Sequence, residues 1–102
     1  MTDTRTEAGW DELDPVLNAP KRLAAMALLC RADSADFGFL RDHLGVSDSD
    51  LSKQMSALQT AGYVASSRAG RGRGGLTTYR ATREGKAAYR RHRGVLQAML
   101  GD

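Results

Sequence analysis

Apolar side chains recur at helical spacing in three stretches of the first half of the chain. In the first stretch, 20–32, four of them fall at i, i+3, i+4 and i+7, namely Leu23, Met26, Ala27 and Cys30. Shorter runs follow over 37–44, with Phe37, Leu40 and Leu44, and over 48–61, with Leu51, Met55 and Leu58. Each pattern predicts a helix that turns one apolar stripe toward a shared core, and Cys30 is then a small core residue.

Polar residues at the expected ends support these three helices. Asn18 is a candidate N-cap for the first helix, and Pro20 suits its first turn. Asp36 and Ser47 are candidate N-caps of the second and third helices, and Gly45 ends the second. Two residues alone separate Gly45 from the third helix. That short connection is typical of a helix-turn-helix.

The periodicity changes after Gly62, where the third helix should end. Two stretches rich in β-formers, 63–68 and 76–81, flank a glycine- and arginine-rich segment and predict a hairpin with a long tip. Thr82 then caps a last helix over 83–100. Its apolar side consists of Ala88, Tyr89, His92, Val95, Leu96, Met99 and Leu100. The order of elements predicts a mostly helical α+β fold.

Length and composition fit one small domain. The chain has 102 residues, of which 41% are hydrophobic and 26% charged, as in ordinary globular proteins. We expect a flexible N-terminal segment over 1–17, punctuated by Pro15, and a folded domain over 18–102. A single cysteine precludes an internal disulfide, and neither a signal peptide nor a membrane span is recognisable. The cytoplasm is therefore the expected location.

Charge is distributed unevenly along the sequence. Residues 1–50 carry five Lys and Arg against ten Asp and Glu, a balance of −5. Residues 51–102 carry ten against two, a balance of +8. Such asymmetry suggests that one part of the fold faces a polyanion, although a merely solvated basic face is the alternative. The run 90–93 on the last helix is expected to stay solvated.

The segment 70–75 reads G-x-G-x-x-G, which also occurs in dinucleotide-binding loops. That motif requires a helix at its last glycine and an acidic residue about 20 positions later, whereas here a strand-like stretch follows and position 95 is valine. A P-loop would need a terminal Gly-Lys-Ser or Gly-Lys-Thr. The arginines instead favour contact with duplex DNA, through phosphates or the minor groove. A disordered RNA-binding segment and a tip without a role are the other interpretations.

The stretches "LRDHLGVSDSDLSKQMSALQTAGYV" and "GRGRGGLTTYRATREGKAAY" together resemble the winged helix-turn-helix transcriptional regulators, and more closely the small single-domain relatives of the MarR-like family. The resemblance covers about residues 19–100 and rests on the order and spacing of its pieces. It implies a three-helix core, a two-stranded wing hairpin and a C-terminal helix. It also implies that 48–61 is a recognition helix that lies in the major groove of DNA.

The resemblance places the DNA contacts on the outward side of the recognition helix, at its N-cap and on the wing. These residues are Ser47, Ser49, Ser52, Lys53, Ser56, Gln59, Arg68, Arg71 and Arg73. Asp48 and Asp50 depart from this pattern, because carboxylates repel phosphate. Helix capping is their favoured role, ahead of accepting a hydrogen bond from cytosine N4.

Regulators of this kind generally act as symmetric dimers on near-palindromic sites. The candidate dimer surface is the apolar side of the last helix, formed by Tyr89, Val95, Leu96, Met99 and Leu100. Ordinary packing of these side chains onto Leu23 and Met26 is the equal alternative. A small-molecule effector is neither indicated nor excluded.

Other chemistry finds little support in the sequence. His43 and His92 lie on separate predicted helices, and one cysteine cannot supply a zinc cluster. No catalytic residues, metal ligands or cofactors are predicted, so an enzyme is not expected. Two functions remain open: a sequence-specific regulator that binds double-stranded DNA, favoured by the arginines and Lys53, and a winged-helix module that docks another protein.

Overall fold

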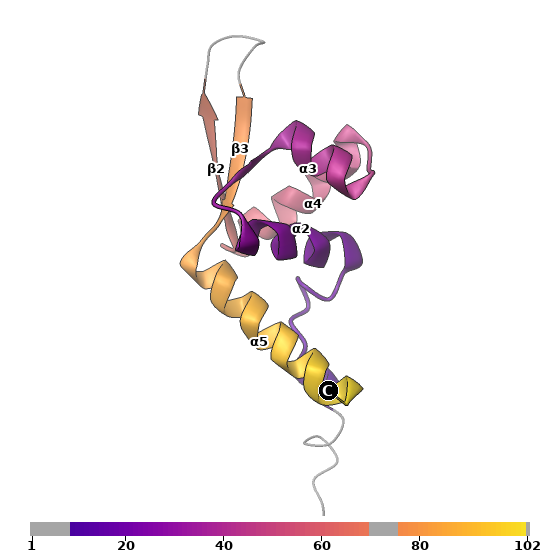
Figure 1. The fold of residues 1–102 in the computed structure, drawn as a ribbon. Coiled ribbons are helices and arrows are strands. Elements are labelled where there is room, and N and C mark those ends of the chain that lie inside the picture. Colours follow the sequence, from indigo (N-terminus) through magenta and orange to yellow (C-terminus); the bar gives the residue numbers. More distant parts are fainter. Residues whose placement is uncertain (1–8, 70–75, 102) are drawn as a thin grey trace, which may run out of the picture.

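The computed structural model describes residues 9–69 and 76–101 of the chain. The elements in these ranges are η1 (Trp10–Glu12), α2 (Pro20–Arg31), β1 (Ala35–Asp36), α3 (Phe37–Leu44), α4 (Asp48–Thr60), β2 (Val64–Ala69), β3 (Leu76–Ala81) and α5 (Arg83–Leu100). Helices α2, α3 and α4 gather beside the base of the β2–β3 hairpin (Figure 1). The hairpin extends from this body in one direction, and α5 extends in the other. The predicted winged helix-turn-helix architecture is confirmed.

The sheet has three strands rather than the two expected for a wing hairpin, in the order β1-β3-β2. The short strand β1 pairs antiparallel with β3, with Ala35 opposite Tyr79 and Asp36 opposite Thr78. Two residues are too few to show alternation of polar and apolar side chains, so no pattern in the sequence predicted this strand. Its pairing fixes the start of α3 against the hairpin.

One hydrophobic core lies between the helices and the base of the sheet. Its buried members are Leu17, Ala25, Met26, Leu28, Leu29, Ala35, Leu40, Leu51, Met55, Leu58, Val64, Tyr79, Ala81 and Ala88. All three predicted core residues of α4 are among them. Burial of this apolar surface supplies most of the driving force for folding.

Helix α2 differs from its predicted stripe. Of the predicted residues only Met26 is buried, whereas Leu23, Ala27 and Cys30 are half-buried. Because α2 contacts α3, α4, α5 and β3, more than one side of it is covered, and the core also takes Ala25, Leu28 and Leu29. Burial raises the pKa of the Cys30 thiol, against the opposing charges of Lys86 and Arg90.

Three of the four predicted N-caps are confirmed. The side chains of Asp36, Ser47 and Thr82 accept from the backbone N–H groups of Phe39, Asp50 and Gly85. Gly45 ends α3 with φ 67°, the left-handed conformation expected of it. The prediction for Asn18 was wrong, since α2 begins after Ala19 with no side-chain cap. Pro20 at its first position has no N–H to satisfy, which reduces the need for one.

Residues 9–17, which the sequence assigned to a flexible segment, pack against the folded body instead. Leu17 is fully buried, and the carboxylate of Asp14 accepts from the backbone N–H groups of Val16 and Leu17 at 2.8 and 3.1 Å. The backbone N–H of Asp14 donates to Nδ1 of His92 on α5 at 3.0 Å. Residues 1–8 lie outside the described part of the chain.

A tight junction joins the end of α4 to the start of α5. The Thr82 hydroxyl donates to the carbonyl oxygen of Gly62 at 2.7 Å, and the backbone N–H of Thr82 donates to that of Tyr63 at 3.0 Å. Gly85 is buried against this turn, and a Cβ atom there would lie 2.0 Å from the carbonyl oxygen of Tyr63. Only glycine permits this approach, which fixes α5 relative to α4 and the hairpin.

Candidate nucleic-acid interface

The outward side of α4 is an open polar surface. Ser49, Ser52, Lys53, Ser56 and Gln59 are all exposed, as their spacing against the buried stripe predicted. Short hydroxyls and one ammonium group can meet both phosphates and base edges. The structure thus brings five of the nine predicted contact residues together on one helix face.

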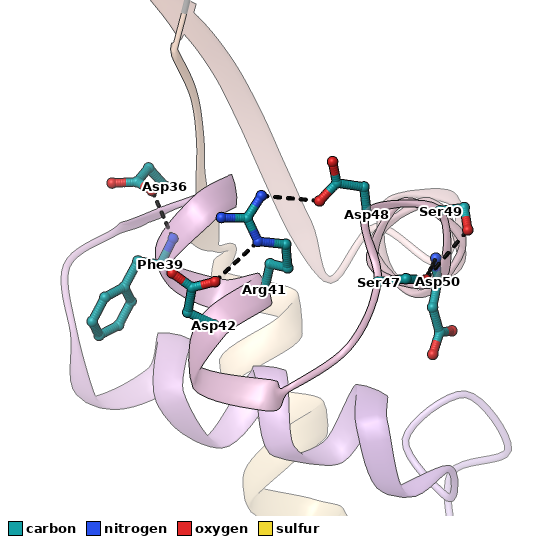
Figure 2. Close-up of polar contacts among 8 residues, drawn as sticks. All are labelled: Asp36, Phe39, Arg41, Asp42, Ser47, Asp48, Ser49 and Asp50. Atoms are coloured by element: carbon teal, nitrogen blue, oxygen red, sulfur yellow. Dashed lines mark hydrogen bonds and ion pairs between the residues drawn. The ribbon is translucent and has the colours of Figure 1, made fainter.

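Ser47 has a structural partner in the same turn. Its hydroxyl oxygen accepts from the backbone N–H of Asp50 at 3.1 Å and lies 3.3 Å from the hydroxyl of Ser49. Because this bond satisfies one of the free N–H groups at the helix start, Ser47 caps α4. Figure 2 shows this turn of the helix.

The two acidic residues of this turn are both paired with cations. Asp48 accepts from Nη1 of Arg41 on α3 at 3.0 Å, and Nε of the same guanidinium donates to Asp42 at 3.0 Å (Figure 2). Hydrogen bonds to the two carboxylates, Asp42 first, raise the pKa of Arg41 above its usual value. The negative charge that Asp48 would present to DNA is thereby partly offset.

Asp50 is paired in a similar way on the other side of the turn. Its carboxylate accepts from Nζ of Lys21 at the start of α2 and from the amide of Gln54. These hydrogen bonds, that from Lys21 first, lower the pKa of Asp50. Arg22, the next residue after Lys21, donates to Gln54 at 3.0 Å and so joins the same network.

The far end of α4 is tied to the wing. The Gln59 amide donates to the hydroxyl of Ser66 on β2 at 3.0 Å. Ser66 and Arg68 are two positions apart on this strand, so their side chains share one face of the hairpin. Arg68 also donates to the hydroxyl of Thr77, its partner across the strands, at 3.0 Å. The wing strand therefore continues the surface of α4, and it carries an arginine on the same side.

Arg71 and Arg73, the other two predicted wing contacts, lie outside the described residues.

The exposed arginines Arg90, Arg91 and Arg93 on α5 are solvated, as expected for the basic run. His92 departs from that run, because it is 1% exposed and Nε2 has no hydrogen-bond partner in the described part of the protein. Since Nδ1 accepts from Asp14, the neutral ring carries its proton on Nε2.

The predicted dimer residues on α5 divide into two groups. Tyr89 packs against the core, and Val95, Leu96 and Met99 are half-buried, with Gly9 beside Val95 and Met99. Leu100 is 77% exposed, and Trp10 on η1 is 66% exposed. The end of α5 therefore presents apolar surface that the described residues do not cover.

Sequence reasoning did not identify Arg41 or Lys21 as residues that shape this site. Arg41 and Lys21 are far from their partners in sequence, by 7 and 29 positions, and surface charges occur throughout the chain. A weak signal for Arg41 was available: a basic residue in the last turn of one helix, followed closely by an acidic first turn of the next.

Among the described residues, no cluster of three or more His, Cys, Asp or Glu side chains could hold a metal ion. None of the described helices is long and apolar enough to cross a membrane.

Solved structures share this fold at low sequence identity. A transcriptional regulator homologue from Pyrococcus horikoshii OT3 has a TM-score of 0.78 at 24% identity, over 83% of this chain and 84% of that one. PcaV, a transcriptional regulator from Streptomyces coelicolor solved with its natural ligand, has a TM-score of 0.72 at 20% identity, over 95% and 68%. The zinc-responsive MarR family member ZitR of Lactococcus lactis has a TM-score of 0.61 at 18% identity, over 78% and 54%. The chain thus spans little more than half of ZitR.

No curated protein matches the chain. A family model described as winged helix DNA-binding domain matches residues 21–100, which include α2 to α5 and the whole candidate interface. Because this match covers well over half of the chain, the chain belongs to the winged helix DNA-binding domain family.

Proposed function

We propose that the protein is a dimeric, sequence-specific repressor that acts in the cytoplasm. The exposed side of α4 enters the major groove, and the wing arginines Arg68, Arg71 and Arg73 hold phosphates or the minor groove. The observation that carries this proposal is the hydrogen bond from Gln59 to Ser66, since it joins α4 and the wing strand into one polar, basic surface. A surface of that kind matches the two grooves of a duplex.

The paired acids bear on the alternative function. Free carboxylates at the start of α4 would favour a module that docks another protein, since they repel phosphate. Arg41 is paired with Asp48, whose side chain is exposed, and Lys21 is paired with Asp50, whose side chain is half-buried. The two carboxylates that would repel DNA are thereby paired with cations, and no contact among the described residues specifically favours protein docking.

The wing contribution is tested with the double variant Arg71→Ala/Arg73→Ala. We expect it to bind every duplex sequence about 10- to 100-fold more weakly, with a shallower dependence of log affinity on log salt, because each lost phosphate contact removes about 0.9 from that slope. Arg90→Ala/Arg93→Ala on α5 removes the same charge far along the chain and is the matched control. Equal affinities and slopes for the two double variants would refute the wing assignment.

The dimer is proposed to form through the exposed end of α5, where Leu100 and Trp10 offer uncovered apolar surface. Two such domains related by a two-fold axis would place their recognition helices on successive turns of one DNA face. Leu96→Asp/Leu100→Asp should convert the dimer to a monomer in analytical ultracentrifugation and abolish tight binding to a palindrome. A wild-type monomer at micromolar concentration would contradict this part of the proposal.

A further inference from the structure

Arg41 lies at the boundary between the two helices of the helix-turn-helix and is held by both. One carboxylate, that of Asp42, comes from its own helix α3, and the other, that of Asp48, is the first residue of α4 (Figure 2). Each hydrogen bond is 3.0 Å long, and the Arg41 side chain remains 37% exposed. A single exposed ion pair contributes little to stability, whereas this guanidinium has two carboxylate partners, one on each helix, that together restrain its direction.

A guanidinium has five N–H groups. The two bonds to Asp42 and Asp48 use two of them, which leaves three donors, including both on Nη2. Nη1 lies against Asp48, the first residue of α4, whereas Nη2 faces the start of α3, where a Cβ atom on Gly38 would lie 3.7 Å from it (Figure 2). The first turn of a recognition helix is where base edges are contacted. The guanidinium of Arg41 therefore lies next to the first residue of α4, with three donors that have no partner among the described residues, although Arg41 belongs to the preceding helix.

We propose that Arg41 reads a guanine in the major groove, and that Asp42 and Asp48 are positioning residues which hold its guanidinium for that contact. This inference rests on the proposed function and specifies how α3 contributes to it. Guanine displays two acceptors, O6 and N7, at the spacing of two neighbouring guanidinium N–H groups. No other base presents this pair in the major groove.

Holding Arg41 in place for this contact would explain why Asp42 and Asp48 lie at a surface that binds the negatively charged DNA. A free arginine side chain loses rotamer freedom when it binds, whereas one held by two hydrogen bonds has already lost it in the free protein. The same two bonds keep the carboxylates occupied, so their repulsion of phosphate is reduced. Lysine could replace the charge of Arg41, but it could not hold two acids and offer a planar pair of donors at once.

The test is selection of bound duplexes from a random library, followed by affinity measurements on the selected site with its guanines changed one at a time. Wild type should prefer guanine at one position of each half-site by about 10- to 100-fold. Arg41→Ala and Arg41→Lys should both lose that preference and keep the preferences at every other position. Arg41→Lys, which keeps the positive charge beside Asp42 and Asp48, should also keep the salt slope. Arg90→Ala, at an exposed arginine outside the interface, should retain the whole motif.

The positioning role has its own readout. Asp48→Asn and Asp42→Asn should weaken the preference for the same guanine and for no other base, and their effects should vanish in the Arg41→Ala background. A merely structural role would change the melting temperature and leave base preference in place, so thermal unfolding of each variant is measured alongside.

Each other outcome overturns the inference. If Arg41→Ala selects the same motif as wild type, the contact does not exist, and the proposed function stands without it. If Arg41→Ala weakens all sequences equally and Arg41→Lys restores the wild-type affinity with the guanine preference intact, Arg41 supplies only positive charge, at a phosphate or beside Asp48. If wild type itself selects no motif, the proposed function fails and this inference fails with it.

Discussion

The junction at the start of α5 and the outward side of α4 are built in opposite ways. At the junction, Gly85 is in direct contact with the backbone of Tyr63, and Thr82 spans the turn with two hydrogen bonds. On α4, Ser52 and Ser56 are exposed and have no hydrogen-bond partner among the described residues. One region leaves no room for a methyl group, and the other leaves most of its polar groups available.

The two regions therefore have different roles. The junction orients the elements that carry the candidate interface, and the outward side of α4 forms the interface itself. The junction fixes the direction of α5 relative to α4 and the hairpin, so it sets where a second protomer would carry its own recognition helix. The surface of α4 contributes little to folding, because its exposed hydroxyls bury no apolar area. Changes at the junction should therefore alter stability, and changes on α4 should alter DNA recognition.

The largest effect is expected for Gly85→Ala. Its Cβ would lie 2.0 Å from a backbone oxygen, so the helix or the turn must move, and we expect a loss of about 3 kcal/mol in the free energy of unfolding. Gly94→Ala on the same helix is the matched control, since a Cβ there meets nothing within 4 Å. Replacing that exposed helical glycine should stabilise the protein by about 0.5–1 kcal/mol. Urea unfolding of both variants measures the difference, and equal values would mean that the junction is not tight.

The second effect concerns Asp14, which links residues 9–17 to the junction through Tyr63. Burial raises the pKa of its carboxyl, but hydrogen bonds from the Tyr63 hydroxyl and from two backbone N–H groups outweigh burial and lower the pKa below 3.8. The ionised carboxylate therefore stabilises the fold at pH values above 3.8, and this contribution is lost as the pH falls through the lowered pKa.

We expect Asp14→Asn to cost about 2 kcal/mol at neutral pH, since it removes a charged acceptor from three donors. The unfolding free energies of wild type and variant should converge as the pH drops below 3.8. Tyr63→Phe, which removes one donor and leaves the carboxylate, should show a smaller loss. A constant gap from pH 7 to pH 3 would show that the charge of Asp14 is not what matters.

Features with a local signal were predictable from the sequence, and features made by distant partners were not. The helices α3 and α4, their caps Asp36 and Ser47, and the buried stripe of α4 depend on neighbours within one or two turns. The pairing of β1 with β3 joins residues more than 40 positions apart, and Asp14 meets His92 across 78. No periodicity marks such contacts.

The candidate interface also contains both kinds of feature, those with a local sequence signal and those formed by distant partners. The outward residues of α4 followed from its buried stripe, because a helix that buries Leu51, Met55 and Leu58 must expose the opposite side. The pairing of Asp48 with Arg41 depends instead on how α3 crosses the start of α4. The sequence therefore suggested that the first turn of α4 is acidic and repels DNA. In the structure, the two acidic residues of that turn are paired with Arg41 and Lys21.

Ser47 stands between the two regions, because it lies at the interface yet caps the helix. If capping is its main role, Ser47→Ala should lower the free energy of unfolding by about 1 kcal/mol. Ser49→Ala, two positions away and exposed, is the control and should stay within about 0.5 kcal/mol of wild type. A large loss of DNA affinity without any loss of stability would move Ser47 to the surface that reads DNA.

The smallest change in stability is expected for Ser52→Ala. The hydroxyl is exposed in the middle of α4, so the free energy of unfolding should change by less than about 0.5 kcal/mol. Base preference should nevertheless change at one position of the selected site, because a serine hydroxyl on the outward side reaches either a base edge or a phosphate. Ser67→Ala on β2 is the matched control: Ser67 is exposed on the opposite face of the hairpin from Ser66 and should leave the motif as it is. The opposite result, with base preference altered by Ser67→Ala and not by Ser52→Ala, would mean that DNA contacts the wing face turned away from Gln59. In that case α4 and the wing would not form one DNA-binding surface.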